Sequence, residues 1–243
     1  MISTLRQHAG LALKRYVERR AYMALTKNPA LREILQHARK PGFKYYQPDI
    51  TTNIDYSDSL ALYRWIRKHK PKEILEFGPG VSTLIMAQAL YENGRGRVTT
   101  IENIEKFLVK AKDSCPERLQ PYIEYLLIPD VKKRYGPFHG VGYDHIPKRD
   151  YELVFVDGPN YDAQSEFDVD VLDVIARSEK PVSAFIDSRT GSSFMYHLIL
   201  GKKFKYRYLT GLGFIDAATK RDLQPFKKIV ATAMKRRAFR RWW

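Results

Sequence analysis

Two acidic residues stand where the chain could hold a ligand that contains a ribose. Glu76 lies two residues before Gly78 in the turn Phe77-Gly78-Pro79-Gly80, and Glu102 follows 22 residues after Gly80. Gly78 and Gly80 allow tight backbone geometry and a close approach of a ligand. An acidic residue at the end of a second strand can accept hydrogen bonds from both hydroxyls of a ribose. The spacing predicts one ligand site shared by the two segments.

The residues in and after this turn distinguish between known kinds of nucleotide-binding site. Ser82 or Thr83 can cap a following helix, whose free N–H groups attract an anionic group. A phosphate-binding P-loop would need a lysine in this turn, and the sequence has none there. The dinucleotide fingerprint would place a small residue where Thr83 stands and would not call for an acid at position 76. Both of these nucleotide-binding motifs are therefore disfavoured.

The elements that position these residues follow one another as strand and helix. Ser57 or Asp58 can cap the helix before the first strand. The strands are expected at Glu73–Phe77, Arg97–Glu102, Ile123–Ile128, Tyr151–Val156 and Val182–Ile186, and the helices at 57–69, 82–91, 105–114, 165–177 and 194–200. This alternation predicts an α/β fold with a doubly wound, mostly parallel, Rossmann-like sheet and helices on both faces. Ligands of such sheets bind beyond the carboxyl ends of the strands.

The rest of the chain is expected to frame this domain. Residues 3–38 predict one or two helices, broken near Asn28-Pro29. Residues 136–148 read as a glycine- and proline-rich loop, and two late strands are expected at 206–209 and 229–234 with a looped segment between them. The predicted organisation is a basic helical N-terminal extension (1–53), a ligand-binding domain (54–235) and a basic aromatic tail (236–243).

With these residues in order, the sequence resembles the class I S-adenosylmethionine-dependent methyltransferases. Glu76, Gly78 and Gly80 match their first motif, and Glu102 matches the acidic residue that closes their second strand. The block Tyr151–Pro159, with Asp157-Gly158 after a strand, resembles the O-methyltransferase-like members. The resemblance implies S-adenosylmethionine as cofactor. The cofactor-binding residues that we infer are Glu76, Gly78, Gly80, Ser82, Thr83, Glu102, Asp130 and Asp157, with Glu76 at the methionine end, Glu102 at the ribose and Asp130 at the adenine.

Transfer of a methyl group to oxygen needs a base that removes the hydroxyl proton. Candidates are Asp157, His139 and His145, with Asp187 as a further strand-end carboxylate. In the metal-dependent O-methyltransferases, carboxylates after the fourth and fifth strands hold a divalent cation. Ser188 stands where those enzymes often have asparagine, so the sequence predicts no metal and an activity that survives chelation.

A run of acidic residues, formed by Asp162, Glu166, Asp168, Asp170 and Asp173, is expected mostly to supply charges favoured at a helix N-terminus. One or two of them could instead face a substrate. The single cysteine, Cys115, excludes an internal disulfide and indicates a cytoplasmic setting. No uninterrupted apolar segment of a signal peptide is present near the N-terminus.

The net charge of +15 is concentrated at the two ends of the chain. Residues 1–50 carry 10 basic and 3 acidic residues, and residues 201–243 carry 13 and 2. The C-terminus has basic residues beside aromatic ones, a mixture that suits an anionic membrane interface on the inner face of the membrane. These residues are Lys235, Arg236, Arg237, Arg240 and Arg241, with Phe239, Trp242 and Trp243. The favoured alternative is that the first helix packs on the sheet domain or on a second subunit and that the tail is a disordered solubility extension.

Three functions remain open from the sequence. The favoured one is methylation of a hydroxyl on a small molecule or glycan. The second is an RNA methyltransferase that uses the basic ends, which is less favoured because no RNA-binding module is recognised. The third is a cofactor-binding protein without transfer activity. The fold alone does not decide between them.

Overall fold

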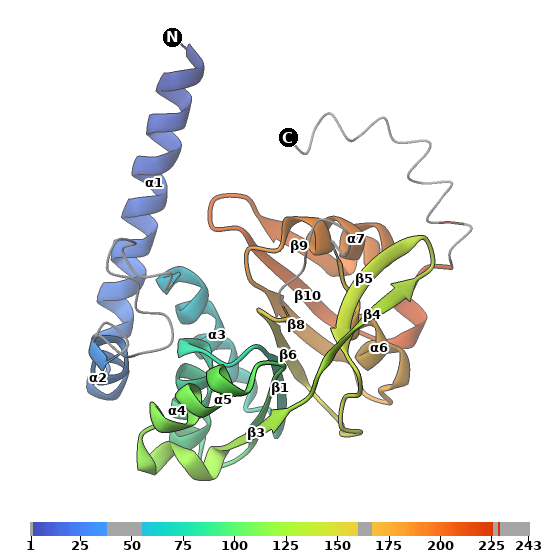
Figure 1. Ribbon diagram of the computed structural model, residues 1–243. Helices are drawn as coiled ribbons and strands as arrows, with labels where there is room; N and C mark the ends of the chain where they lie inside the picture. The colour runs from blue at the N-terminus through green and yellow to red at the C-terminus, as the bar shows by residue number, and fades with distance from the viewer. Residues whose placement is uncertain (1, 38–54, 160–166, 226–227, 229–243) are drawn as a thin grey trace.

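A mixed seven-stranded sheet forms the centre of the molecule. The computed structural model describes residues 2–37, 55–159, 167–225 and 228 (Figure 1). The strands of this sheet are β1 (Glu73–Phe77), β2 (Arg97–Glu102), β3 (Ile123–Leu127), β6 (Leu153–Val156), β8 (Val182–Ile186), β9 (Phe204–Arg207) and β10 (Leu212–Ala218). Their order is β3-β2-β1-β6-β8-β10-β9, and β10 runs antiparallel to both neighbours. The prediction of an α/β fold with a mostly parallel sheet is confirmed.

The strand order reverses between β1 and β6. From β1 the chain proceeds outward through β2 to β3, whereas β6 starts the other half, which continues through β8. Phe77 pairs with Val156 at the ends of these two central strands. In open α/β sheets the carboxyl ends at such a switch point form the ligand crevice, because the connections on either side diverge there. The turn after β1 and the segment after β6 therefore meet at the expected place.

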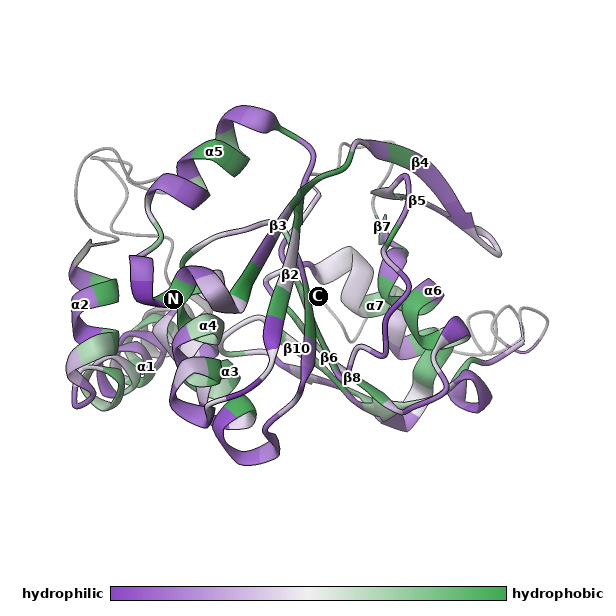
Figure 2. Cartoon of the chain, turned by 90° about the horizontal axis from the view of Figure 1, so that it is seen from below, coloured by the Kyte–Doolittle hydropathy of each residue, from purple (hydrophilic) through white to green (hydrophobic). Residues whose placement is uncertain are grey.

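Helices cover both faces of the sheet. Figure 2 shows α3 (Tyr56–His69), α4 (Val81–Asn93) and α5 (Glu105–Asp113) on one side, and α6 (Asp170–Arg177) and α7 (Thr190–Leu200) on the other. Alternate strand residues serve the two layers, as the pleat requires. Ile74 and Phe155 pack in the cluster that includes α3 and α4, whereas Leu75 and Val154 pack in the one that includes α6 and α7.

Two N-terminal helices extend the first of these layers. The helices are α1 (Ile2–Leu25) and α2 (Pro29–His37), which confirms the predicted break at Asn28-Pro29. Asn28 Oδ1 accepts hydrogen bonds from the backbone N–H groups of Ala30 and Leu31, which caps α2. Buried apolar residues at the end of α1 and along α2 join those of α4 in one cluster: Leu25, Leu31, Ile34, Leu35, Val81, Leu84 and Ile85. None of the helices in the described residues is long and apolar enough to span a bilayer.

The connection between β3 and β6 differs from the sequence-based expectation. Residues 136–148 were expected to form a loop, but β4 (Asp130–Tyr135) and β5 (Phe138–Tyr143) form an antiparallel hairpin that pairs with β7 (Phe167–Asp168). The expectation was wrong because the turn residues Gly136 and Pro137 occupy only the hairpin tip. The glycines of this segment, Gly140 and Gly142, lie within β5, where a Cβ would be 2.2 Å from the carbonyl oxygen of Phe167 and 2.3 Å from Asp170 Oδ1, respectively.

The C-terminal half also corrects three expected elements. The helix expected at 165–177 is the short β7 followed by α6, since Asp168 pairs with Val141 as a strand residue. The strand expected at 206–209 is β9, which covers residues 204–207, and the segment expected to be looped contains β10. The strand at 229–234, the tail 236–243, Asp162 and Glu166 lie outside the described residues.

Candidate functional site

The turn after β1 is held together by Glu76. Ser82 Oγ donates to Glu76 Oε1 and Thr83 Oγ1 donates to Glu76 Oε2, both at 2.5 Å. Thr83 Oγ1 also accepts a hydrogen bond from the N–H of Gly80 at 2.8 Å. Gly80, not Ser82 or Thr83, is the N-cap of α4. Glu76 is fully buried, so its carboxylate sets the shape of the turn, while its predicted role at the methionine end of a cofactor stays a prediction.

Two glycines let the turn after β1 touch the segment after β6. Gly78 has a positive φ of 86°, which favours glycine, and a Cβ there would lie 3.1 Å from the backbone of Asp157. A Cβ on Gly158 would lie 2.8 Å from the backbone nitrogen of Gly78 and 2.7 Å from the hydroxyl of Tyr143. Packing therefore explains why a glycine follows Asp157. Gly158 has no side chain, so the segment after β6 can contact the β1 turn, and Asp157 lies beside that turn.

Glu102 ends β2 on the other side of the switch point, as the sequence predicted. Its Oε1 accepts hydrogen bonds from the backbone N–H groups of Asn103 and Ile104, each at 3.1 Å, and only 5% of the residue is exposed. Asn103 Nδ2 in turn donates to Asp130 Oδ1 at 2.8 Å. Asp130 is the first residue of β4 and is exposed. Glu102 and Asp130, predicted at the ribose and adenine, are thus linked through one asparagine.

A pocket lies beside the β1 turn at the carboxyl ends of β6 and β8. It is lined by Asp55, Asp58, Ser59, Leu62, Gly80, Val81, Ser82, Phe155, Asp157 and Asp187. Asp157 and Asp187 follow β6 and β8, as predicted. Three of the residues predicted to bind a cofactor, Gly80, Ser82 and Asp157, therefore border this one pocket.

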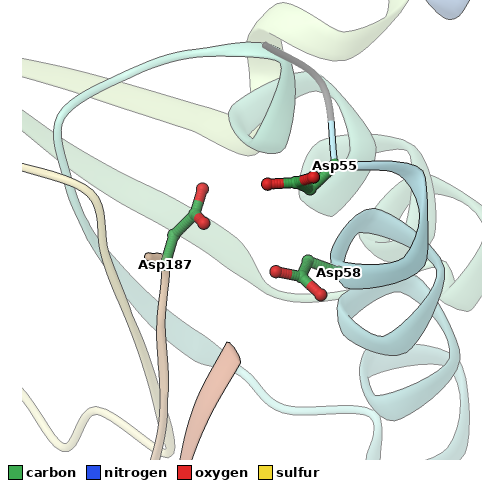
Figure 3. Close-up of side chains that lie close together, drawn as sticks. All are labelled: Asp55, Asp58 and Asp187. Carbon is green, nitrogen blue, oxygen red and sulfur yellow. The ribbon is translucent and has the colours of Figure 1, made fainter. Parts of the chain in front are cut away.

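Three aspartates crowd one side of this pocket (Figure 3). Asp55 and Asp58 come from the start of α3, three residues apart and hence on one helical face, and Asp187 follows β8. One carboxylate oxygen from each residue lies within 4.8 Å of the others. Burial, together with the neighbouring carboxylates of Asp187 and Asp55, raises the pKa of Asp58 to about 8. Burial also raises the pKa values of Asp55 and Asp187.

Sequence reasoning missed the two aspartates of α3. Asp58 was considered only as a helix cap, and the cap residue in the structure is Asp55. The signal available in the sequence was a pair of acidic residues three apart before the first strand. Their proximity to Asp187 depends on how α3 packs on the sheet, which no local pattern reports.

Arg189 holds the segment after β6 in place through hydrogen bonds. This residue was not identified from the sequence. Its Nη1 donates to Asp168 Oδ1 and to the carbonyl oxygen of Pro159, both at 2.8 Å. Ser192 Oγ donates to Asp168 Oδ2 at 2.7 Å. Because Pro159 follows Asp157-Gly158 directly, this arginine ties the segment after β6 to β7 and α7.

The remaining acidic candidates have structural partners. Asp168, expected among the helix N-terminal charges, is a strand residue in the buried pair with Arg189. Asp170 begins α6 and is 2% exposed. It accepts from Lys133 Nζ at 2.6 Å and from the N–H of Tyr143 at 2.7 Å. Burial raises the pKa of Asp170 to about 6, against the lowering effect of Lys133.

The two candidate histidines are not brought to the pocket. His139 lies on β5 opposite Arg134 and is exposed. His145 is exposed beside Asp144, with Nδ1 at 3.3 Å from Asp144 Oδ2. Neither is among the residues that line the pocket of Asp157. Of the four candidate bases, the structure places the two carboxylates, Asp157 and Asp187, in this pocket.

The strand order defines a doubly wound α/β fold. The candidate site lies at the carboxyl ends of β1, β2 and β6, on both sides of the point where the strand order reverses. No protein-family model matches this chain, and no curated protein matches it. Among solved structures, it is similar to the O-methyltransferase from Bacillus cereus in complex with SAH. The two chains are 18% identical, with a TM-score of 0.51 over 84% of this chain and 95% of that one.

The chain is also similar to the O-methyltransferase TomG from Streptomyces achromogenes in complex with SAM, involved in tomaymycin synthesis. The identity is 17% and the TM-score 0.47, over 77% of this chain and 87% of that one. At sequence identities this low, structural similarity is evidence for the fold alone. We base the fold comparison on the Bacillus cereus structure, which has a TM-score of 0.51. The chain therefore has a Rossmann-like methyltransferase fold.

Proposed function

We propose that this protein is an S-adenosylmethionine-dependent methyltransferase that methylates a hydroxyl group of a small molecule or glycan. The observation that carries the proposal is the arrangement at the switch point. Gly78 and Gly158 bring the β1 turn against Asp157, and the buried Glu102 ends the neighbouring strand. The fold shared with the Bacillus cereus O-methyltransferase, which was solved in complex with SAH, also supports the proposed methyltransferase activity.

The residues present fit this cofactor in charge and shape. Glu102 would hold the ribose hydroxyls, because a strand-end carboxylate accepts both of them. The glycine turn after β1 would admit the methionine end near Gly80 and Ser82, which border the pocket. The cofactor itself supplies a methyl group activated by a positively charged sulfur, so the protein mainly needs to align the acceptor and exclude water.

Asp157 is our candidate for the base that takes the acceptor's proton. It lines the pocket and follows β6, next to the glycine turn. A carboxylate within hydrogen-bond reach of an acceptor hydroxyl can remove its proton as the methyl group moves. The preference for oxygen over nitrogen or carbon as the methylated atom belongs to the proposal and rests on the resemblance of the Tyr151–Pro159 block.

Cofactor binding tests the proposal directly. Titration calorimetry should show that the full chain binds S-adenosylmethionine and S-adenosylhomocysteine. We expect Glu102→Ala to weaken binding by about 1–3 kcal/mol, the cost of losing charge-assisted hydrogen bonds. Glu117→Ala, at an exposed position outside the site, is the control and should leave the dissociation constant unchanged. Absence of binding by folded wild type would overturn the assignment, and an unchanged constant for Glu102→Ala would show that another residue holds the ribose.

A labelled-cofactor screen tests the acceptor class. Small molecules, glycans and RNA would be offered separately, with transfer of the labelled methyl group as the readout. We expect incorporation into hydroxyl-bearing small molecules or glycans. Incorporation into RNA alone, together with a steep salt dependence of RNA binding, would favour the alternative that the basic ends suggested.

A further inference from the structure

We propose that Asp55, Asp58 and Asp187 form a binding site for one divalent cation that prefers oxygen ligands, such as Mg²⁺ or Mn²⁺. Each residue offers a carboxylate oxygen, and these oxygens lie within 4.8 Å of one another. Figure 3 shows the carboxylates of the two α3 residues facing that of Asp187 across a small gap. Carboxylate oxygens are the ligands that such cations take from proteins.

The second observation is that two buried oxygens of this cluster, one on Asp58 and one on Asp187, have no hydrogen-bond donor among the described residues. Asp58 is 4% exposed, and its Oδ2 accepts no hydrogen bond from the residues that the structure describes. Oδ1 of Asp187 is likewise buried and without a donor among those residues. A buried carboxylate without a partner is costly, so native structures pair such groups or place them on metals. A bound cation would satisfy both atoms at once.

The nearby cationic side chain does not fill this role. Lys14 of α1 lies 3.6 Å from Asp55 Oδ1 and is 42% exposed, and its ion pair reaches Asp55 alone. Glu18, also of α1, accepts hydrogen bonds from the backbone and side chain of Ser57 and adds negative charge nearby. Arg189 also lowers the pKa of Asp187, but its Nη1 donates to Asp168 and to the carbonyl oxygen of Pro159. The three clustered carboxylates and Glu18 therefore outnumber the nearby cationic side chains, which favours a further, doubly charged partner.

The ligand set differs from the one that the family resemblance implies. That resemblance pairs Asp157 with Asp187 and places a third ligand at position 188. In the structure Asp187 is grouped with two aspartates of α3, and Asp157 is outside the cluster although it lines the same pocket. The sequence-based expectation of a metal-free site considered only Asp157, Asp187 and Ser188. The inference replaces that expectation.

The role of the cation rests on the proposed function. The cluster shares its pocket with Gly80 and Ser82, assigned to the cofactor, and with Asp157, the candidate base, so a cation there would lie beside both. A divalent cation stabilises the deprotonated form of an oxygen that coordinates it. The site would therefore select acceptors that present an oxygen atom to the metal, and a transferase activity should be lost with EDTA and restored by Mg²⁺.

Manganese titration of the full chain, freed of metal with chelator, tests the site without any substrate. Electron paramagnetic resonance follows the free Mn²⁺ signal as protein is added. We expect one Mn²⁺ per chain for wild type and at least a 10-fold weaker affinity for Asp58→Asn, which keeps the shape of the side chain but removes its charge. Asp216→Asn, in an exposed ion pair with Lys205, is the matched control and should bind as wild type does.

Thermal unfolding gives a second readout that a merely structural role would not produce. Mg²⁺ should raise the melting temperature of wild type and of Asp216→Asn, because a ligand that binds only the folded state stabilises it. In EDTA, Asp58→Asn should melt higher than wild type, since one buried charge is gone from the cluster. If Asp58→Asn fails to fold, Asp55→Asn takes its place in both measurements.

Two results would overturn the inference. One is the absence of Mn²⁺ binding by wild type up to about 1 mM, the weak limit of protein sites for such cations. The other is unchanged binding in Asp58→Asn or Asp55→Asn. Calorimetry with S-adenosylhomocysteine on the same samples separates this test from that of the function. Cofactor binding without Mn²⁺ binding overturns the cation site alone, and Mn²⁺ binding without cofactor binding overturns the proposed function alone.

Discussion

The substitution Arg189→Met is expected to lower the free energy of unfolding by about 3–5 kcal/mol, the usual cost of removing one partner of a buried ion pair. Arg189 is 6% exposed and Asp168 is 2% exposed, so neither can exchange its partner for water. Burial already raises the pKa of Asp168, and Arg189 is the largest influence that opposes this. Without the arginine, Asp168 keeps its hydrogen bond from Ser192 but has no counter-ion in this pair.

The effect should depend on pH in a defined direction. In the variant, the folded-state pKa of Asp168 rises further above its unfolded value of about 3.9. A carboxyl whose pKa is raised on folding makes the protein less stable as the pH increases through that interval. The loss of stability should therefore be smaller at pH 5 than at pH 8.

Urea unfolding followed by circular dichroism measures this effect. Lys205→Met removes one partner of an exposed ion pair, with Lys205 63% and Asp216 50% exposed, and is the matched control. We expect a loss of no more than about 1 kcal/mol there, because exposed pairs contribute little. A comparable loss for both variants would contradict the role assigned to the buried pair.

The substitution Gly78→Ala is expected to cost about 2–4 kcal/mol of stability and to abolish detectable cofactor binding. Part of the cost is the positive φ of 86°, which a residue with a Cβ adopts only with strain. The rest comes from displacement of the Asp157 backbone, 3.1 Å from the new Cβ, because packed backbone cannot yield without local shifts. Such a shift moves both walls of the predicted cofactor site.

Gly94→Ala separates the two contributions. Gly94 ends α4 with a positive φ of 68°, but a Cβ there would meet nothing within 4 Å. This variant should lose about 1 kcal/mol, the cost of the left-handed conformation alone, and should bind S-adenosylhomocysteine as wild type does. Urea unfolding and calorimetry on both variants make the comparison. Normal cofactor binding by folded Gly78→Ala would show that the contact between the two segments is not needed.

Short-range patterns allowed much of the central sheet to be predicted. The bounds of β1, β2 and β8 agree with the sequence-based expectation, because each is rich in apolar or β-branched residues and stops at a turn or an acidic residue. β10 was missed, and its Gly213 is a poor strand former. Gly213 is accommodated through antiparallel pairing with Ile186 of β8 and Tyr206 of β9, which supplies backbone hydrogen bonds that do not depend on side chains.

The sequence by itself determined those residues of the candidate site that directly follow or end a strand. Glu76, the two glycines of the β1 turn, Glu102 and Asp157 could be predicted because their positions follow from where a strand stops. Tertiary structure alone decided the partners of these residues. Asp55 and Asp58 are more than 120 residues from Asp187, and Arg189 is 21 residues from Asp168. Such pairs meet only when helices pack on the sheet, and that packing depends on the burial of many apolar side chains at once rather than on any local motif.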